Sequence, residues 1–344
     1  MCVKRGGNSW KVLLTILIMA ALILDSQTAL RSARQALELC IQTVIPSLFP
    51  FLFLSRVITG NTGSNCGRLG KTVCRLYRIP QGAEMILVTG LLGGYPVGAK
   101  SLGIAVASGQ LSEKTARRML IFCNAAGPAF LFGITGLLFQ QFRDPWLLWF
   151  IHVFSGLCVA LLIPSSPGER YQASVVRANT SLPKKLRGSL LTMAEICGWI
   201  ILTRVLIAIL ERWFLGYISL PWRIWITGML ELSNGCVSLQ ELSCPGLRFV
   251  LCGVFLGFGG LCVVLQTASA AGKMDTGMYL KGKLLQGGIS FLLAYILQFI
   301  IYSSDNRMIL SPYLLLGVGA LTIILIIFLR KAEKRCGILD SVGV

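Results

Sequence analysis

The sequence predicts an all-α polytopic membrane protein with about eight transmembrane helices and two re-entrant hairpins, arranged as an inverted repeat with discontinuous helices. The 344 residues are 55% hydrophobic and 13% charged, with a mean hydropathy of +0.73. Several apolar runs approach or exceed the roughly 20 residues that a helix needs to cross about 30 Å of hydrocarbon. Two pairs of apolar legs are too short to cross alone, which favours hairpins that enter and leave on one side. A soluble globular domain does not fit this composition.

The chain divides into two repeats flanked by end segments. We assign residues 1–36 to a tail and first helix, residues 37–163 to the first repeat and residues 164–189 to a cytoplasmic basic loop. Residues 190–302 form the second repeat, and residues 303–344 form a last helix with a basic C-terminal tail. The predicted spans are residues 12–24, 37–58, 119–139, 146–163, 190–210, 247–269, 284–302 and 312–329. The first span has the length of a signal-peptide core, but no small-residue cleavage site follows it cleanly. We therefore expect a retained helix, with cleavage as the alternative.

Each repeat combines a hairpin with an interrupted helix. The first hairpin, residues 84–107, turns at a Gly-Gly-Tyr-Pro tip, and each leg is only roughly 16 Å long as a helix. The following span, 119–139, contains Asn-Ala-Ala-Gly-Pro near its middle, where proline and glycine should break the helix. Residues 222–242 and 247–269 are the corresponding hairpin and broken helix of the second repeat. Helix ends at mid-membrane depth are costly unless they line a cavity or bind a ligand, so this pattern predicts a transport site.

The distribution of basic residues predicts the topology. Most of the 32 Lys and Arg residues fall on segments that an N-in, C-in arrangement places in the cytoplasm, including Lys273, Lys281 and Lys283. The first hairpin then opens to the cytoplasm and the second to the outside. Short matches fit an inverted repeat: Thr89-Gly90 aligns with Thr227-Gly228, Gly127-Pro128 with Gly259-Gly260, and Thr135 with Thr267.

Three motifs resemble one membrane-protein family. Residues 45–51 read IPSLFPF, residues 94–100 read GYPVGAK, and residues 122–130 read FCNAAGPAF. They resemble the YlbJ family of sporulation integral membrane proteins over about residues 37–329. That family has a nucleoside-recognition gate domain and a fold similar to the concentrative nucleoside transporters. The chain departs from it at residues 232–236, LSNGC, where members commonly have a Gly-rich or Thr-rich tip.

The resemblance implies export of dipicolinic acid from the mother cell toward the forespore, across the outer forespore membrane if the host sporulates. Dipicolinate is a flat dianion, and helix N-termini with exposed N–H groups favour carboxylates. Lys100 could add charge or simply snorkel, Tyr95 could stack on the ring or simply pack, and Glu231 could carry a coupling proton or cation, or pair with Lys100. The full set of candidate substrate-binding residues is Gly94, Tyr95, Pro96, Lys100, Asn124, Gly127, Pro128, Glu231, Ser233, Asn234, Gly259, Gly260 and Thr267.

Other chemistry has little support in the sequence. The single histidine, His152, has no nearby Cys or His, so we expect no metal site. No C-x-x-C or Walker motif occurs, so reduced thiols and no cofactor are expected, and no enzyme activity. The formal charge of +18 follows the loops, which indicates a lipid bilayer and no nucleic acid. A homo-oligomer or sporulation membrane partners are possible.

Three functions remain open at this point. The first is a transporter for a small anionic aromatic dicarboxylate. The second is a nucleoside or other nutrient secondary transporter, although the first tip lacks the acidic Gln/Thr-Glu signature associated with nucleoside carriers. The third is a structural sporulation membrane protein that transports nothing, for which matched helix breaks would be unnecessary.

Overall fold

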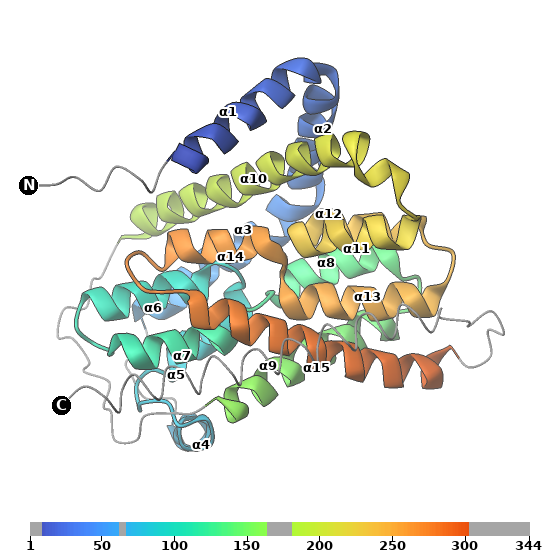
Figure 1. Cartoon of the computed structure of the whole chain (residues 1–344). Helices are drawn as coiled ribbons and strands as arrows, with labels where there is room; N and C mark the ends of the chain where they lie inside the picture. The colour runs from blue at the N-terminus through green and yellow to red at the C-terminus, as the bar shows by residue number, and fades with distance from the viewer. Residues whose placement is uncertain (1–8, 62–66, 164–180, 303–344) are drawn as a thin grey trace, which may run out of the picture.

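A computed structural model of the chain describes residues 9–61, 67–163 and 181–302 (Figure 1). All regular structure within these ranges is helical. The predicted last span, residues 312–329, lies outside the described residues, as does most of the predicted basic loop.

Six helical segments in the described part are long and apolar enough to cross a membrane, which supports an integral membrane protein. Six of the predicted spans coincide with them. The other predicted span in the described part, residues 12–24, lies in α1 (Ser9–Leu24), whose 16 residues are short for a bilayer. The six segments are Ser26–Val57, Glu113–Leu138, Arg143–Leu162, Leu182–Trp213, Pro245–Ala270 and Gly277–Ile301.

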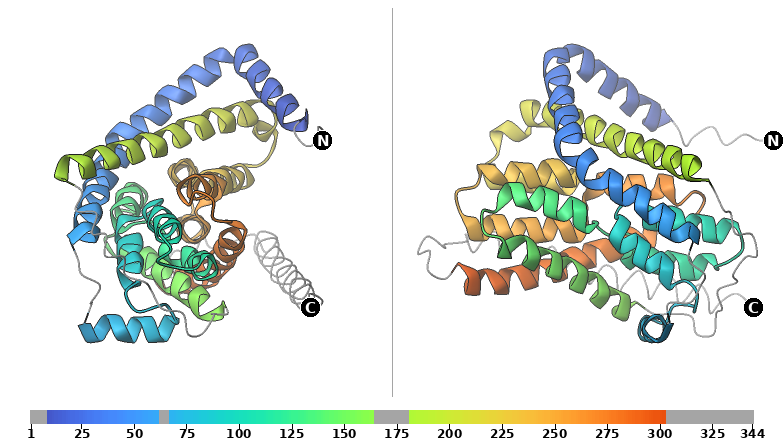
Figure 2. Two further views of the ribbon diagram at one scale, coloured as in Figure 1. Left: turned by 90° about the vertical axis from the view of Figure 1, so that its left-hand side faces the viewer. Right: turned by 180° about the vertical axis from the view of Figure 1, so that it is seen from behind.

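The helix that contains the second predicted span begins at Ser26, before the apolar run that starts at residue 37. Helix α2 (Ser26–Leu39) leads through a π-helical turn (Cys40–Val44) into α3 (Ile45–Asn61). The first turns of α2 are polar, so hydropathy alone does not reveal them, but the helix packs along α10 (Leu182–Trp213). Figure 2 shows α2 and α3 meeting at an angle, and a π-helical turn is a common cause of such a bend.

A further helix lies between α3 and the first hairpin. Helix α4 (Gly67–Tyr77) crosses the direction of the bundle and is seen nearly end-on in Figure 1. Its basic residues Arg68, Lys71 and Arg75 are exposed.

Two pairs of short, packed helices and two interrupted helices lie in the residue ranges that the sequence predicts for hairpins and breaks. The breaks have different causes: four residues separate α7 from α8, with Pro128 at the start of α8 where its missing N–H is harmless, whereas Gly259 and Gly260 have positive φ angles that end α13. The first half contains α5 (Glu84–Gly93), α6 (Val97–Ala107), α7 (Glu113–Cys123) and α8 (Pro128–Leu138). The second half contains α11 (Leu220–Leu230), α12 (Leu232–Ser238), α13 (Pro245–Phe258) and α14 (Gly260–Ala270).

The two halves use glycine in the same way to close their hairpins. A Cβ atom at Gly90 would overlap with the carbonyl of Cys123, and one at Gly228 would overlap with the side chain of Phe255. Cys123 and Phe255 lie four residues before the aligned glycines Gly127 and Gly259 of the two breaks. The glycine of each Thr-Gly pair thus lets a hairpin approach the first half of the broken helix that follows it.

The halves also interlock. In Figure 1 the α5–α6 hairpin and the α11–α12 hairpin lie at opposite ends of the bundle. Helix α8 packs against α12, and α14 packs against α6, so the second part of each broken helix contacts the hairpin of the other half. Helices α9 (Arg143–Leu162) and α15 (Gly277–Ile301) pack together and against α13.

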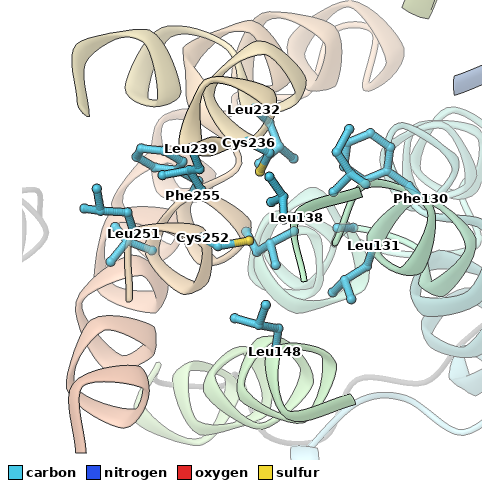
Figure 3. Close-up of a cluster of buried hydrophobic side chains, with 14 of the residues drawn as sticks. Phe130, Leu131, Leu138, Leu148, Leu232, Cys236, Leu239, Leu251, Cys252 and Phe255 are labelled. Carbon is cyan, nitrogen blue, oxygen red and sulfur yellow. The ribbon is translucent and has the colours of Figure 1, made fainter. Parts of the chain in front are cut away.

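An apolar core fills the space where α8, α9, α12 and α13 meet. Figure 3 shows Leu138, Cys236 and Cys252 in the middle of this core, with Phe130 and Phe255 on opposite sides and Leu148 of α9 beneath them. All nine cysteines in the described part of the chain are free, as expected for reduced thiols.

Candidate functional site

A small cavity lies where the hairpin tips and the helix breaks meet. Its volume is about 30 Å³, which admits water but no aromatic dicarboxylate. The conformation is therefore closed at its centre, and a larger molecule requires movement of the lining elements. The lining residues are Val44, Leu48, Tyr95, Gly127, Phe130, Ile196, Ile200, Glu231, Leu232, Ser233, Val263 and Gln266.

Glu231 forms the tip of the second hairpin. It joins α11 to α12 and is only 2% exposed. Its carboxylate accepts hydrogen bonds from the backbone N–H groups of Ser233 (3.0 Å) and Asn234 (2.6 Å), and from the side-chain amide of Asn234 (2.6 Å). First-turn N–H groups have no partner within their own helix, so Glu231 caps α12. A Cβ atom at Gly260 would lie 3.1 Å from the backbone nitrogen of Leu232, so this tip abuts the second break.

The tip of the first hairpin touches both breaks. Gly94, with φ at +71°, packs on the first break, because a Cβ atom there would lie 2.7 Å from the nitrogen of Gly127. Tyr95 follows and precedes Pro96 through a cis peptide bond. The Tyr95 hydroxyl is buried without a hydrogen-bond partner, and a Cβ atom at Gly259 in the second break would lie 2.9 Å from it.

A lysine of α15, Lys283, lies beside the ring of Tyr95. Lys283 is fully buried, and its Nζ lies 5.5 Å from the centroid of the Tyr95 ring. The Nζ donates a hydrogen bond of 2.6 Å to Oε1 of Gln286. The amide nitrogen of Gln286 donates in turn to the backbone carbonyl of His152 on α9, at 3.0 Å. These bonds fix the orientation of the Gln286 amide beside the ammonium group.

His152 holds the first break in place. Its Nε2 accepts a hydrogen bond of 3.0 Å from the backbone N–H of Ala126, within the interruption between α7 and α8. This bond assigns the acceptor role to Nε2, and in neutral imidazole the proton is then on Nδ1. His152 is thus a buried positioning residue.

Asn124 ties the first break to three other elements. Its side-chain oxygen accepts from the backbone N–H of Ala99 (3.3 Å), and its amide nitrogen donates to the hydroxyls of Thr267 (2.8 Å) and Tyr279 (3.1 Å). Asn124 and Thr267 are fully buried and are not among the residues that line the central cavity. Their polar groups therefore join α6, α14 and α15 in the closed conformation.

Among known proteins, the chain is similar to YlbJ. Over 320 residues, which cover 79% of the chain and 78% of that protein, it is 24% identical to the sporulation integral membrane protein YlbJ of Bacillus subtilis (strain 168). This similarity supports the YlbJ resemblance that the three motifs carry. No protein-family model and no solved structure matches the chain.

Most of the residues predicted from the sequence gather around the centre. Those that line the cavity are Tyr95, Gly127, Glu231 and Ser233. Others belong to the hairpin tips and helix breaks around the cavity without lining it: Gly94, Pro96, Pro128, Asn234, Gly259 and Gly260.

Lys100 lies elsewhere. It is partly exposed and lines a separate hollow of about 650 Å³ between α6 and the turn after α14, together with Lys273 and Glu113. In this conformation Lys100 contacts neither the cavity nor Glu231.

The YlbJ motifs do not include the polar face of α15, and hydropathy does not mark it. The distribution of basic residues predicts Lys283 in a cytoplasmic loop, which is wrong, because α15 already begins at Gly277 and Lys283 is fully buried. A signal was present: Tyr279, Lys283, Gln286 and Ser290 recur at spacings of four and three, which puts them on one face of a helix. All four are buried.

Proposed function

We propose that this protein is a membrane transporter that moves a small organic anion, with dipicolinic acid as the first candidate, across the membrane around the forespore of a sporulating host. One observation carries the proposal: both hairpin tips and the first helix break line one central cavity, and the second break packs against both tips. Interrupted helices that meet at a fixed site are typical of secondary transporters, which expose the site to either side by moving one repeat against the other. The similarity to a sporulation integral membrane protein supports the biological setting.

The groups at the centre suit a planar carboxylate. Tyr95 offers an aromatic face and an unpartnered hydroxyl, and Gly127 and Phe130 place the first turn of α8 beside the cavity, where an anion would be near the N-terminus of that helix. Glu231 faces the same cavity with a carboxylate, so an anion enters either with a proton on Glu231 or after its side chain turns away. Transport needs no covalent chemistry, and the proposal involves neither cofactor nor metal.

Competition for uptake tests the substrate class. The purified protein is reconstituted in liposomes, and uptake of labelled dipicolinate is measured with excess unlabelled dipicolinate, picolinate, isophthalate or uridine. We expect dipicolinate to compete best, isophthalate to compete because it keeps both carboxylates, and uridine to have no effect.

Two other outcomes select the alternative functions. Uptake of labelled uridine would identify a nucleoside carrier instead. Uptake of neither compound above that of protein-free liposomes would favour a structural role in the sporulation membrane.

A further inference from the structure

Lys283 is a buried cation without a counter-charge in the described part of the chain. Its side chain is fully buried in a helix long and apolar enough to cross the membrane. None of the ion pairs among the described residues includes it. A charged residue at such a position is costly, and it persists where it pairs with another group or serves a substrate pathway.

The neighbours of Lys283 orient the ammonium group without neutralising it. An ammonium has three N–H donors, and Gln286 accepts one of them at 2.6 Å. Gln286 is itself held by the carbonyl of His152. The remaining charged surface faces the ring of Tyr95, whose centroid lies 5.5 Å from Nζ. A cation over an aromatic face is stabilised only modestly.

Tyr95 links this cation to the cavity. The tyrosine lines the cavity, and its hydroxyl is buried with no hydrogen-bond partner. A buried hydroxyl without a partner is unfavourable, so displacement of Tyr95 costs no hydrogen bond. Its backbone belongs to the tip of the first hairpin, an element that must move for the closed cavity to admit a substrate.

From these contacts we propose that Lys283 is the residue that binds the carboxylate of the transported anion, and that Tyr95 separates it from the cavity in the closed conformation. This inference rests on the proposed transport function and names its charged contact. A planar aromatic carboxylate suits the pair, because its ring can stack on Tyr95 while its carboxylate reaches the ammonium group. Lys100, in a separate hollow, is then not the principal anion contact.

Replacement of Lys283 by methionine tests the inference. Wild-type protein, Lys283→Met and Lys281→Met are purified in nanodiscs, and the melting temperature is measured against dipicolinate concentration. Lys281 is the matched control, since it is exposed on the same helix two residues away. Lys283→Met should fold, because an apolar side chain of similar volume replaces a buried charge without loss of packing.

We expect the apparent Kd for dipicolinate to rise about 10- to 100-fold in Lys283→Met, as for loss of a charge-assisted hydrogen bond, and to stay unchanged in Lys281→Met. Lys283→Gln, which can still reach Gln286, gives the same readout if the methionine variant does not fold. A wild-type Kd in a folded Lys283 variant would overturn this inference and leave the transport proposal standing. Absence of both binding and uptake in the wild type would overturn the two together.

Discussion

At the scale of single residues, the buried polar groups divide into those that face the cavity and those that hold the closed structure together. Glu231 and Tyr95 face the cavity, whereas Asn124 and Thr267 satisfy each other away from it. The sequence could indicate that Tyr95, Asn124 and Glu231 lie near the centre, because each is within a few residues of a glycine or proline. It could not indicate where each side chain points, because that direction depends on helices that are distant in the chain.

Asn124 and Thr267 should be energetically coupled. Asn124→Ala removes hydrogen bonds to three elements and should lower the free energy of unfolding by about 1–3 kcal/mol, while Thr267→Val removes one acceptor. Because both changes break the same bond, the double variant should be less destabilised than the sum of the single ones, by about 0.5 kcal/mol or more. Thermal unfolding of the three variants in nanodiscs measures this coupling.

Thr135 supplies the matched control. It aligns with Thr267 in the repeat, is buried, and donates to the carbonyl of Leu131 in its own helix. Asn124→Ala and Thr135→Val should therefore be additive. If the effects of Asn124→Ala and Thr267→Val were also additive, this would contradict the hydrogen bond between Asn124 and Thr267.

At the scale of elements, glycine and proline made the hairpins and breaks predictable. The legs predicted within residues 84–107 correspond to α5 and α6, and the predicted interruption at residues 124–128 corresponds to the gap between α7 and α8. Glycine and proline act on the local backbone, so their effect can be predicted without knowledge of the fold. Hydropathy did not reveal the polar first turns of α2 and α15, since it marks only the apolar part of a helix.

Close packing inside the second hairpin gives a prediction for Gly235. A Cβ atom there would overlap with Cα of Gly228, and neither backbone can move without separating α11 from α12. Gly235→Ala should therefore destabilise the protein by about 1–3 kcal/mol, with a lower melting temperature. Fluorescence-detected gel filtration after heating checks this.

Gly198→Ala is the control for that substitution. Gly198 lies in α10 with no heavy atom within 4 Å of the position of its Cβ, so alanine there should be neutral or stabilise by up to about 1 kcal/mol. Equal melting temperatures of Gly235→Ala and Gly198→Ala would contradict the close packing of α11 against α12.

At the scale of the whole molecule, the opposite placement of the hairpins leads to a topology prediction. Lys114, at the start of α7, and Ser243, before α13, are both exposed. In a background without the 12 native cysteines, expressed in the cell membrane of non-sporulating cells, we expect an impermeant maleimide to label Ser243→Cys on intact cells and Lys114→Cys only after permeabilisation. This follows from the basic residues, which place the first hairpin opening on the cytoplasmic side. Labelling of both positions from one side would contradict the inverted arrangement.

The most direct test of the transport proposal is the initial rate of labelled dipicolinate uptake by proteoliposomes as a function of dipicolinate concentration. Because the closed centre must open and close in each transport cycle, we predict a rate that saturates and exceeds that of protein-free liposomes. A rate that equals that of protein-free liposomes at every concentration would contradict the proposal.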